Sequence, residues 1–197
     1  MSVCGCHLLT HCEKRMLRRA MLEMRRSMDP AQVEVASRRV QAAVLAHPEF
    51  LRARSVACYL AMKREVQTGE ILAACWRQGK RVCVPAFNGE TNRYELVWYA
   101  RGDETTPGRL HIPEPKVRRK AGAMDVDLHV VPALAYDRSG GRLGHGHGYY
   151  DSILGNWSGL KVGVAFDFQV LDKIPMGSQD IPVDLVVTEI TTYAAQP

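Results

Sequence analysis

The sequence predicts a single α/β domain with a three-layer α/β/α arrangement, a mostly parallel sheet and two N-terminal helices. Three observations favour this class. The chain has 197 residues, which suits one domain of ordinary size. Apolar strand-like runs alternate with helix-like segments, as in a parallel sheet covered by helices. Residue usage, 46% hydrophobic and 24% charged, is that of a soluble globular protein, with no repeat, linker or bilayer-spanning apolar stretch.

Two helices are predicted before any strand. Between Glu13 and Met28, apolar residues recur at steps of three and four, and a strongly basic face lies opposite them. Asp29 and Pro30 favour the start of a second helix, because Asp can cap a helix and Pro suits its first turn. The apolar period continues from there toward Pro48.

The next segments alternate between strand and helix. Ser55 to Ala61 is a nearly continuous apolar run, as expected for a strand covered on both faces. Thr68 to Gly79 has the pattern of a capped helix that ends at glycine, and Arg81 to Phe87 is predicted to be the following strand. This order is the βαβ signature of a parallel sheet.

The second half of the chain supplies more strands and one helix. Residues 94–100 alternate enough to form a strand, whereas residues 101–122 are rich in charge, Gly and Pro and are predicted to be irregular and exposed. Asp127 to Tyr136 is the most strand-like run in the chain. We also expect a helix at 149–157 and short strands at 161–166 and 184–188.

A cluster of glycines directly follows the strongest predicted strand. Five glycines fall among the nine residues 140–148. Glycine accumulates where the backbone needs a positive φ or approaches a ligand closely, and such strand-to-helix turns bind phosphate in α/β enzymes. The run lacks the Lys-Ser/Thr ending of a P-loop and is one residue short of the dinucleotide fingerprint. It is therefore predicted to be an anion site of a less common kind.

Charged side chains in this run have more than one candidate role. Arg142 can hold phosphate oxygens beside the glycine N–H groups. Asp151 can cap the following helix or bind a metal ion that accompanies the phosphates, and its spacing favours the cap. His145 and His147 have a spacing seen in zinc ligands, but the neighbourhood offers no further ligand, so solvent-facing or phosphate-facing rings are favoured.

Two further features fall near the same predicted site. Tyr149 and Tyr150 follow the glycine run and fit either the core or the wall of a flat substrate site. Glu65 follows a predicted strand, which places it at the same edge of the sheet as the glycine run, because ligands bind at the carboxyl ends of parallel strands. This carboxylate is either solvated or an acceptor for N–H groups of a ligand.

Charge and cysteine content narrow the classes of function. The formal charge of +5 suits an anionic ligand, and no RNA-stacking or zinc-finger motif indicates nucleic-acid binding. Cys58, Cys75 and Cys83 lie in apolar runs, so they are predicted to be buried, reduced thiols.

The N-terminal residues are expected to form a flexible extension over 1–12, before a single domain at 13–197. They lack the pattern of a secretory signal, so a cytoplasmic location is expected. The extension contains a metal-like cluster, Cys4, Cys6, His7, His11 and Cys12. Its spacing matches no standard zinc site, which disfavours metal binding.

Several motifs occur in this chain in a characteristic order. They are Lys14-x-x-x-Arg18, Tyr59 to Glu65 followed by Thr68, Ile112-Pro113-Glu114-Pro115, Val131 to Asp137, the glycine run up to Asp151, and Asp180 to Asp184. On these motifs, from about Lys14 to Glu189, the sequence resembles the 5-formyltetrahydrofolate cyclo-ligase family. The glycine run with its preceding strand is the most specific of them.

The resemblance implies the family's three-layer fold and an ATP- and Mg²⁺-dependent ring closure of 5-formyltetrahydrofolate to 5,10-methenyltetrahydrofolate, with release of ADP and phosphate. In this reaction ATP phosphorylates the formyl oxygen, and the substrate's own N10 attacks before phosphate departs. Catalysis would then consist mainly of alignment and charge neutralisation, without a protein nucleophile.

The resemblance also implies overlapping groups of site residues. The ATP-binding residues would be Lys14, Arg18, Arg142, Leu143, Gly144, His145, Gly146, His147, Gly148, Tyr149, Tyr150 and Asp151. The folate-binding residues would be Met62, Glu65 and Tyr150. Arg142 and Tyr150 would be catalytic, and Asp151 would lie near Mg²⁺.

The chain departs from the family pattern at three places. Leu110-His111 stands where members often have an aromatic or small pair, Ala86 where they often have a basic residue, and His147 where some have Lys. An alternative function is therefore that of a family-like protein that binds nucleotide or folate without closing the ring. The expected partners are folate and ATP, with no nucleic acid and no membrane, and the protein is expected to be a monomer.

Overall fold

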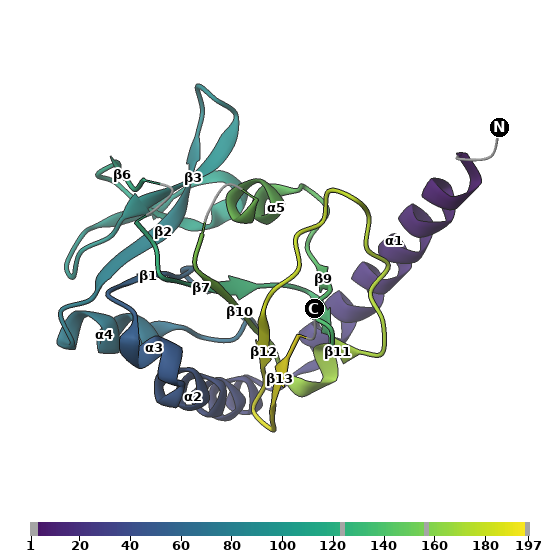
Figure 1. Cartoon of the computed structure of the whole chain (residues 1–197), viewed down its shortest axis with the longest axis horizontal. Helices are drawn as coiled ribbons and strands as arrows, with labels where there is room; N and C mark the ends of the chain where they lie inside the picture. The colour runs from purple at the N-terminus through teal and green to yellow at the C-terminus, as the bar shows by residue number, and fades with distance from the viewer. Residues whose placement is uncertain (1–3, 123–124, 156–157, 196–197) are drawn as a thin grey trace.

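A twisted eight-stranded sheet runs through the computed structural model in the order β13-β12-β10-β7-β1-β2-β3-β6 (Figure 1). The structure describes residues 4–122, 125–155 and 158–195, without the side chains of residues 4–11 and 110. The five strands from β12 to β2 are parallel to one another, whereas β13, β3 and β6 pair antiparallel at the edges. The predicted α/β class with a mostly parallel sheet is confirmed.

The bounds of the strands differ modestly from the predicted runs. The main sheet comprises β1 (Ser55–Ala57), β2 (Arg81–Asn88), β3 (Arg93–Trp98), β6 (Arg119–Lys120), β7 (Leu128–Pro132), β10 (Leu160–Val164), β12 (Leu185–Val187) and β13 (Thr192–Ala194). The central strands are apolar on both faces, as Val56, Val84 and Val130 illustrate with exposed fractions of 2% or less. Burial on both faces explains why these runs are nearly continuous in apolar residues.

The helices are α1 (Cys4–Ser27), α2 (Pro30–Ala46), α3 (Pro48–Arg52), α4 (Gly69–Arg77) and α5 (Tyr149–Leu154). Figure 1 shows α2, α3 and α4 gathered along one side of the sheet and α5 on the other, with α1 reaching out beyond the sheet. The prediction of two N-terminal helices was short by one. A third helix of five residues precedes β1, because Pro48 and its cap His47 restart the helix after the chain turns.

Two local helix signals had different outcomes. Asp29 caps α2 as predicted, accepting a hydrogen bond from Ala31 N–H at 2.7 Å, with Pro30 in the first turn. The predicted cap of α4 was wrong: Thr68 makes no side-chain cap, because its hydroxyl donates instead to Tyr59 O at 2.8 Å.

The helix α1 begins at Cys4, nine residues before the predicted start at Glu13. Among the described residues, no helix is both long and apolar enough to cross a membrane.

The strand predicted over Asp127–Tyr136 is divided in two. β7 ends at Pro132, and β8 (Ala135–Asp137) leaves the main sheet to pair with β9 (Arg142–Leu143) and β11 (Val170–Leu171). The break falls where Leu134 N–H donates to Leu143 O at 2.8 Å and the Gln169 amide donates to Leu134 O at 2.8 Å. These hydrogen bonds join segments far apart in sequence, so the break is not visible in the continuous apolar pattern of the run. The β8–β9 hairpin leads directly into the glycine run.

Residues 101–122 were predicted to be irregular, and this was only partly right. They contain β4 (Thr105–Pro107) paired with β5 (Pro113–Pro115), and a 3-10 turn at Arg109–His111. Glu114 in β5 is 1% exposed and pairs with Arg118 at 2.7 Å. Likewise the run predicted as a strand to Ala61 leaves the sheet after Ala57 and forms the turn that carries Glu65.

Candidate functional site

A cavity of about 880 Å³ lies between α1, the turn that follows β1, the glycine run and the start of α5. Each predicted site residue contributes to its lining: Lys14, Arg18, Met62, Glu65, and all ten residues from Arg142 to Asp151. The tertiary fold therefore brings together residues from three distant parts of the chain. Tyr59, Tyr94, Ile112 and Asp180 line the same cavity and were not among the predicted site residues.

The glycine run adopts the backbone conformations that its composition predicts. Gly146 has φ of +99°, and Gly148 has φ of +67° at the N-terminus of α5. A Cβ on Gly146 would lie only 3.3 Å from the guanidinium carbon of Arg18, whose Nε–H donates to Gly144 O at 2.9 Å. The positive φ therefore favours glycine at position 146, and a larger residue would also press on the Arg18 side chain. Met21 of α1 is buried in the same apolar cluster as Leu143 of β9.

Arg142 is a buried cation at the centre of the cavity wall. Only 3% of its side chain is exposed, and it pairs with Asp151. Its Nε–H has no hydrogen-bond partner among the described residues. A buried donor without a partner is rare in native structures and costs free energy. An anion in the cavity would supply the acceptor that this guanidinium lacks.

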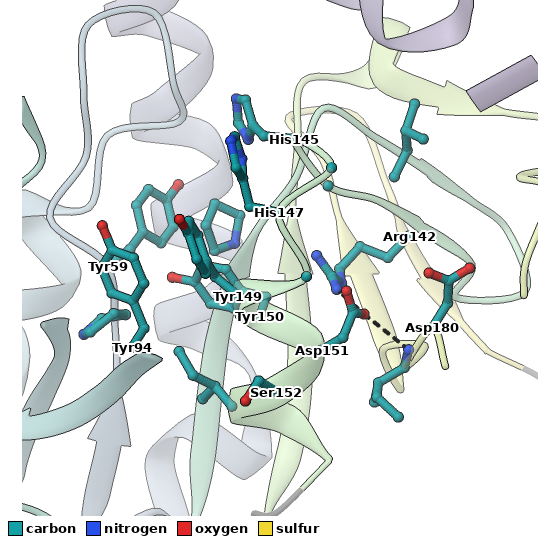
Figure 2. A pocket seen from close by; sticks show the side chains of 18 of the residues that line it. Tyr59, Tyr94, Arg142, His145, His147, Tyr149, Tyr150, Asp151, Ser152 and Asp180 are labelled. Atoms are coloured by element: carbon teal, nitrogen blue, oxygen red, sulfur yellow. Dashed lines mark hydrogen bonds and ion pairs between the residues drawn. The ribbon is translucent and has the colours of Figure 1, made fainter. Parts of the chain in front are cut away.

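Asp151 does not cap α5, contrary to what its spacing favoured. Gly148 occupies the N-cap position, and Asp151 lies in the first turn. Its Oδ1 pairs with Arg142 and accepts Ile181 N–H at 3.1 Å, the contact that Figure 2 marks with a dashed line. The carboxylate therefore ties the glycine run to the segment around residue 181.

A second carboxylate belongs to the same end of the cavity. Asp180 forms an ion pair with Lys14 of α1 and accepts Gly177 N–H at 2.6 Å. Burial alone would raise the pKa of Asp180, but the hydrogen bond from Gly177 and the Lys14 ammonium outweigh it, so the pKa lies below its usual value. Figure 2 shows Asp180 close to Asp151 and Arg142. Two aspartate side chains thus neighbour the cations expected to bind phosphate.

Glu65 lies at another part of the cavity, in a tight turn. Met62 N–H donates to Glu65 Oε2 at 3.0 Å, and Glu65 N–H donates to Met62 O at 3.2 Å. The other oxygen, Oε1, lies 3.5 Å from Nη2 of Arg25 on α1. Burial raises the pKa of Glu65, and Arg25 with the Met62 N–H opposes that rise. The outcome is a nearly buried carboxyl group with one charged partner.

Aromatic rings line the same cavity. The Tyr94 and Tyr149 ring centroids lie 4.6 Å apart, and His147 stacks on Tyr149 at 5.2 Å with an interplanar angle of 6°. Figure 2 shows these rings side by side with Tyr150. Burial raises the pKa of Tyr150 well above its usual value, so its phenol is neutral and can donate a hydrogen bond at physiological pH. Such a wall suits a flat heterocycle.

The histidines of the run face the cavity mouth. The His145 ring is accessible to solvent, yet desolvation by the dense chain around it, followed by the charges of Arg25, His147, Arg18 and Arg142, lowers its pKa to about 4. His145 is therefore neutral at physiological pH and adds no charge to the site. No group of three or more potential metal ligands occurs in the parts of the chain that the structure describes.

Some of the predictions concern residues whose side chains lie outside the described part of the structure. In the N-terminal cluster only the Cys12 side chain is described, and it is exposed; the other four side chains lie outside the described residues. The Leu110 side chain also lies outside them, whereas Ala86 is 1% exposed and does not line the cavity. Of the three departures from the family pattern, His147 is the one that lines the cavity among the described residues.

Arg25 is the functional candidate that sequence reasoning missed most clearly. The helical pattern predicts Arg25 on a basic outer face, but only 7% of the residue is exposed. A signal was present in its spacing. Lys14, Arg18, Met21 and Arg25 follow one another at steps of four, three and four, so they share one face of α1.

Comparisons with known proteins identify the family of this sequence. Residues 10–189 match the profile of the 5-formyltetrahydrofolate cyclo-ligase family. The chain is 33% identical over 172 residues to the 5-formyltetrahydrofolate cyclo-ligase of Escherichia coli strain K12, covering 84% of this chain and 94% of that protein. It is 30% identical over 159 residues to the protein of the same name from Mus musculus, covering 74% and 78%.

Solved structures are also similar. The 5,10-methenyltetrahydrofolate synthetase of Aquifex aeolicus has a TM-score of 0.83 and 33% identity to this chain, with 93% of each chain covered. The 5,10-methenyltetrahydrofolate synthetase of Mycoplasma pneumoniae has a TM-score of 0.71 at 19% identity, covering 89% of this chain and 98% of that one, which supports the fold alone.

Proposed function

This chain belongs to the 5-formyltetrahydrofolate cyclo-ligase family, and we propose that it uses ATP to close 5-formyltetrahydrofolate to 5,10-methenyltetrahydrofolate, with release of ADP and phosphate. One observation carries the proposal. A single cavity is lined by both Arg142 and Glu65. Arg142 is a buried arginine with an unpartnered N–H beside a glycine-rich turn, and Glu65 is a nearly buried carboxylate in a cavity that aromatic rings also line. The first end suits a polyphosphate and the second suits a flat heterocycle with N–H donors.

We assign the ATP subsite to Lys14, Arg18 and the run from Arg142 to Asp151. Three cations and a turn with exposed backbone N–H groups provide the charge and the donors that a triphosphate needs. Arg18 already holds the turn through Gly144 O, so the backbone of the run is ordered around the expected anion. Little reorganisation would then accompany binding, which favours catalysis by positioning.

Mg²⁺ fits this subsite as an ion held largely by phosphate oxygens. Magnesium commonly takes one or two carboxylates together with substrate phosphates, so it needs no cluster of three protein ligands. Asp151, with Asp180 beside it, would hold the ion, and the two segments are already joined by the bond from Ile181 N–H to Asp151. When bound, the ion would neutralise charge that develops on the transferred phosphoryl group. Arg142 and Lys14 would then exchange their carboxylate partners for phosphate.

The folate subsite is assigned to Met62, Glu65 and Tyr150, with Tyr94 and Tyr149 as flat neighbours. An ionised Glu65 accepts hydrogen bonds only, which matches the ring N–H and amino groups of a pterin. Its Oε2 accepts Met62 N–H, which restrains the carboxylate of a residue that lines the cavity. Rings from Tyr94 and Tyr149 supply apolar surface for a planar ligand.

The chemistry follows from alignment of the two ligands. The formyl oxygen attacks the γ-phosphorus of ATP and ADP leaves; N10 of the folate then attacks the formyl carbon, loses its proton, and phosphate departs with the original formyl oxygen. Neither step needs a protein nucleophile. Arg142 and Lys14 stabilise the transferred phosphoryl group, and the neutral phenol of Tyr150 donates a hydrogen bond near the reacting atoms.

The direct test is formation of the methenyl product. Purified protein with 5-formyltetrahydrofolate and Mg-ATP is expected to develop the near-ultraviolet absorbance of the methenyl group, with ADP released in equal amount. Omission of ATP should abolish the signal. Tight binding of both ligands without any ATP-dependent absorbance would instead favour the alternative, a binding protein that does not close the ring.

Tyr150→Phe is expected to lower kcat by about 10²-fold, with small changes in the KM values, because it removes one donor near the reacting atoms. Its buried phenol does not titrate in the working range, so the pH profile of the residual activity should keep its shape. Tyr193→Phe in β13, outside the cavity, is the matched control and should behave as wild type. A Tyr150→Phe enzyme with wild-type kcat would remove this tyrosine from the mechanism.

A further inference from the structure

Arg25 and Glu65 form an ion pair that is nearly closed to solvent. The side chains are each 9% exposed, and Nη2 of Arg25 lies 3.5 Å from Oε1 of Glu65. Exposed ion pairs contribute little to stability, and charges are seldom buried without a partner. Here the pair joins a helix to a turn 40 residues away at the wall of the cavity.

The contacts of Glu65 assign a separate function to each of its oxygens. Oε2 accepts Met62 N–H within the turn, and that bond alone would tolerate a protonated carboxyl group. Oε1 faces Arg25, the one cation paired with Glu65 among the described residues. An opposite charge at this distance favours the ionised carboxylate. Arg25 itself does not line the cavity, whereas Glu65 does, so Glu65 connects Arg25 to a bound ligand.

We propose that Arg25 is a positioning residue for the folate subsite: from α1 it keeps Glu65 ionised and oriented as an acceptor for the N–H donors of the substrate. The inference rests on the proposed function of that subsite. It extends it to a residue that touches neither ligand. It also gives α1 two tasks, because the same helix face presents Lys14 and Arg18 to the phosphate subsite.

The remaining groups near Glu65 do not replace Arg25. Tyr59 after β1, Tyr136 in β8 and Tyr150 in α5 lie within electrostatic range of Glu65, and burial raises the pKa of each of these phenols, so they stay neutral. His145 of the glycine run lies near Arg25 and is neutral as well, since its pKa is lowered to about 4. Loss of Arg25 would therefore leave Glu65 without a charged partner among the described groups.

Arg25→Met is expected to move the acid limb of kcat/KM for 5-formyltetrahydrofolate to higher pH by about one unit. The sign follows from the carboxyl group: without Arg25 its pKa rises, so the ionised acceptor is lost at a higher pH. At mildly acidic pH the KM for the folate should therefore rise about tenfold, and the difference from wild type should shrink as pH increases. The KM for ATP should change less than threefold at any pH.

Two variants separate this positioning from a structural role. Arg25→Lys keeps the charge and should recover most of the wild-type pH profile. Arg26→Met removes an equal charge from the neighbouring, exposed position and should leave the profile unchanged. A loss of activity that is uniform across pH, or that is equal for both substrates, would contradict the proposal and indicate that Arg25 only supports the fold.

A readout independent of turnover covers the case in which the chain does not close the ring. In protein labelled with ¹³C at glutamate carboxyl carbons, the Glu65 signal is assigned by its absence in Glu65→Gln. Its titration midpoint should lie about one unit higher in Arg25→Met than in wild type. Equal midpoints would overturn the positioning role whatever the enzyme assay shows. A shifted midpoint without any folate binding would instead overturn the proposed function.

Discussion

Arg142→Met is expected to lower kcat/KM for ATP-dependent ring closure by about 10³- to 10⁵-fold, the range in which a single arginine stabilises phosphoryl transfer. The variant keeps most of the side-chain volume but removes the buried guanidinium. Asp151 would then lose its cationic partner. The proposed phosphate subsite would lose the Nε–H of Arg142, a donor that has no acceptor among the described residues. Steady-state kinetics in ATP and in 5-formyltetrahydrofolate measure the loss, and most of it should appear in kcat.

Controls on the same hairpin isolate this effect. Arg142→Lys keeps the charge without the planar fork and should recover only part of the activity, because a lysine cannot contact Asp151 and phosphate in the same geometry. Arg138→Met lies in the exposed turn between β8 and β9 and should retain wild-type kinetics. If Arg142→Met stayed within tenfold of wild type while folded, the glycine run would not be the phosphate subsite.

Asp137→Ala is expected to be the most destabilising single change in this region, lowering the free energy of unfolding by about 4 kcal/mol. Asp137 is 2% exposed, and its carboxylate accepts four hydrogen bonds. Oδ1 accepts Ser139 N–H at 3.0 Å, the Ser139 hydroxyl at 2.8 Å and Gly141 N–H at 2.8 Å, while Oδ2 accepts Ile174 N–H at 2.8 Å. Alanine would leave these backbone donors without an acceptor in the closed turn.

Urea unfolding followed by circular dichroism tests this prediction. Asp137→Asn keeps the shape and one acceptor, but its amide NH₂ would oppose a backbone donor, so about half the loss is expected. Asp172→Ala, an exposed aspartate close to Ile174 in sequence, should change the stability by less than about 0.5 kcal/mol. A loss below about 1 kcal/mol for Asp137→Ala would mean that the turn holds its shape without this carboxylate.

The Asp137 turn also explains one glycine of the run. A Cβ on Gly141 would lie 2.4 Å from Asp137 Oδ2. This glycine thus belongs to the hairpin that carries the site and does not need to contact a ligand. The sequence shows five clustered glycines but does not separate those that fold the hairpin from those, such as Gly146, that let another element approach.

Elements with strong local patterns were predicted well. Both long N-terminal helices and the β1–α4–β2 unit follow from apolar periodicity and helix-start signals. The wrong predictions concern elements that are shaped by contacts with residues distant in the sequence. The run from Asp127 to Tyr136 breaks because Gln169 and Leu143 form hydrogen bonds with its backbone. Thr68 does not cap α4 because its hydroxyl donates a hydrogen bond to Tyr59 O.

By itself, the sequence determined the family, the parallel α/β core and the contiguous part of the cavity lining from Arg142 to Asp151, since neighbouring residues share a turn whatever the rest of the chain does. Only the tertiary structure decided the partners of those residues. It paired Arg142 with Asp151, Lys14 with Asp180, and Arg25 with Glu65. The physical reason is that charge pairing at a buried site depends on which side chains the packed elements bring within a few ångströms, and spacing along the chain does not encode that distance.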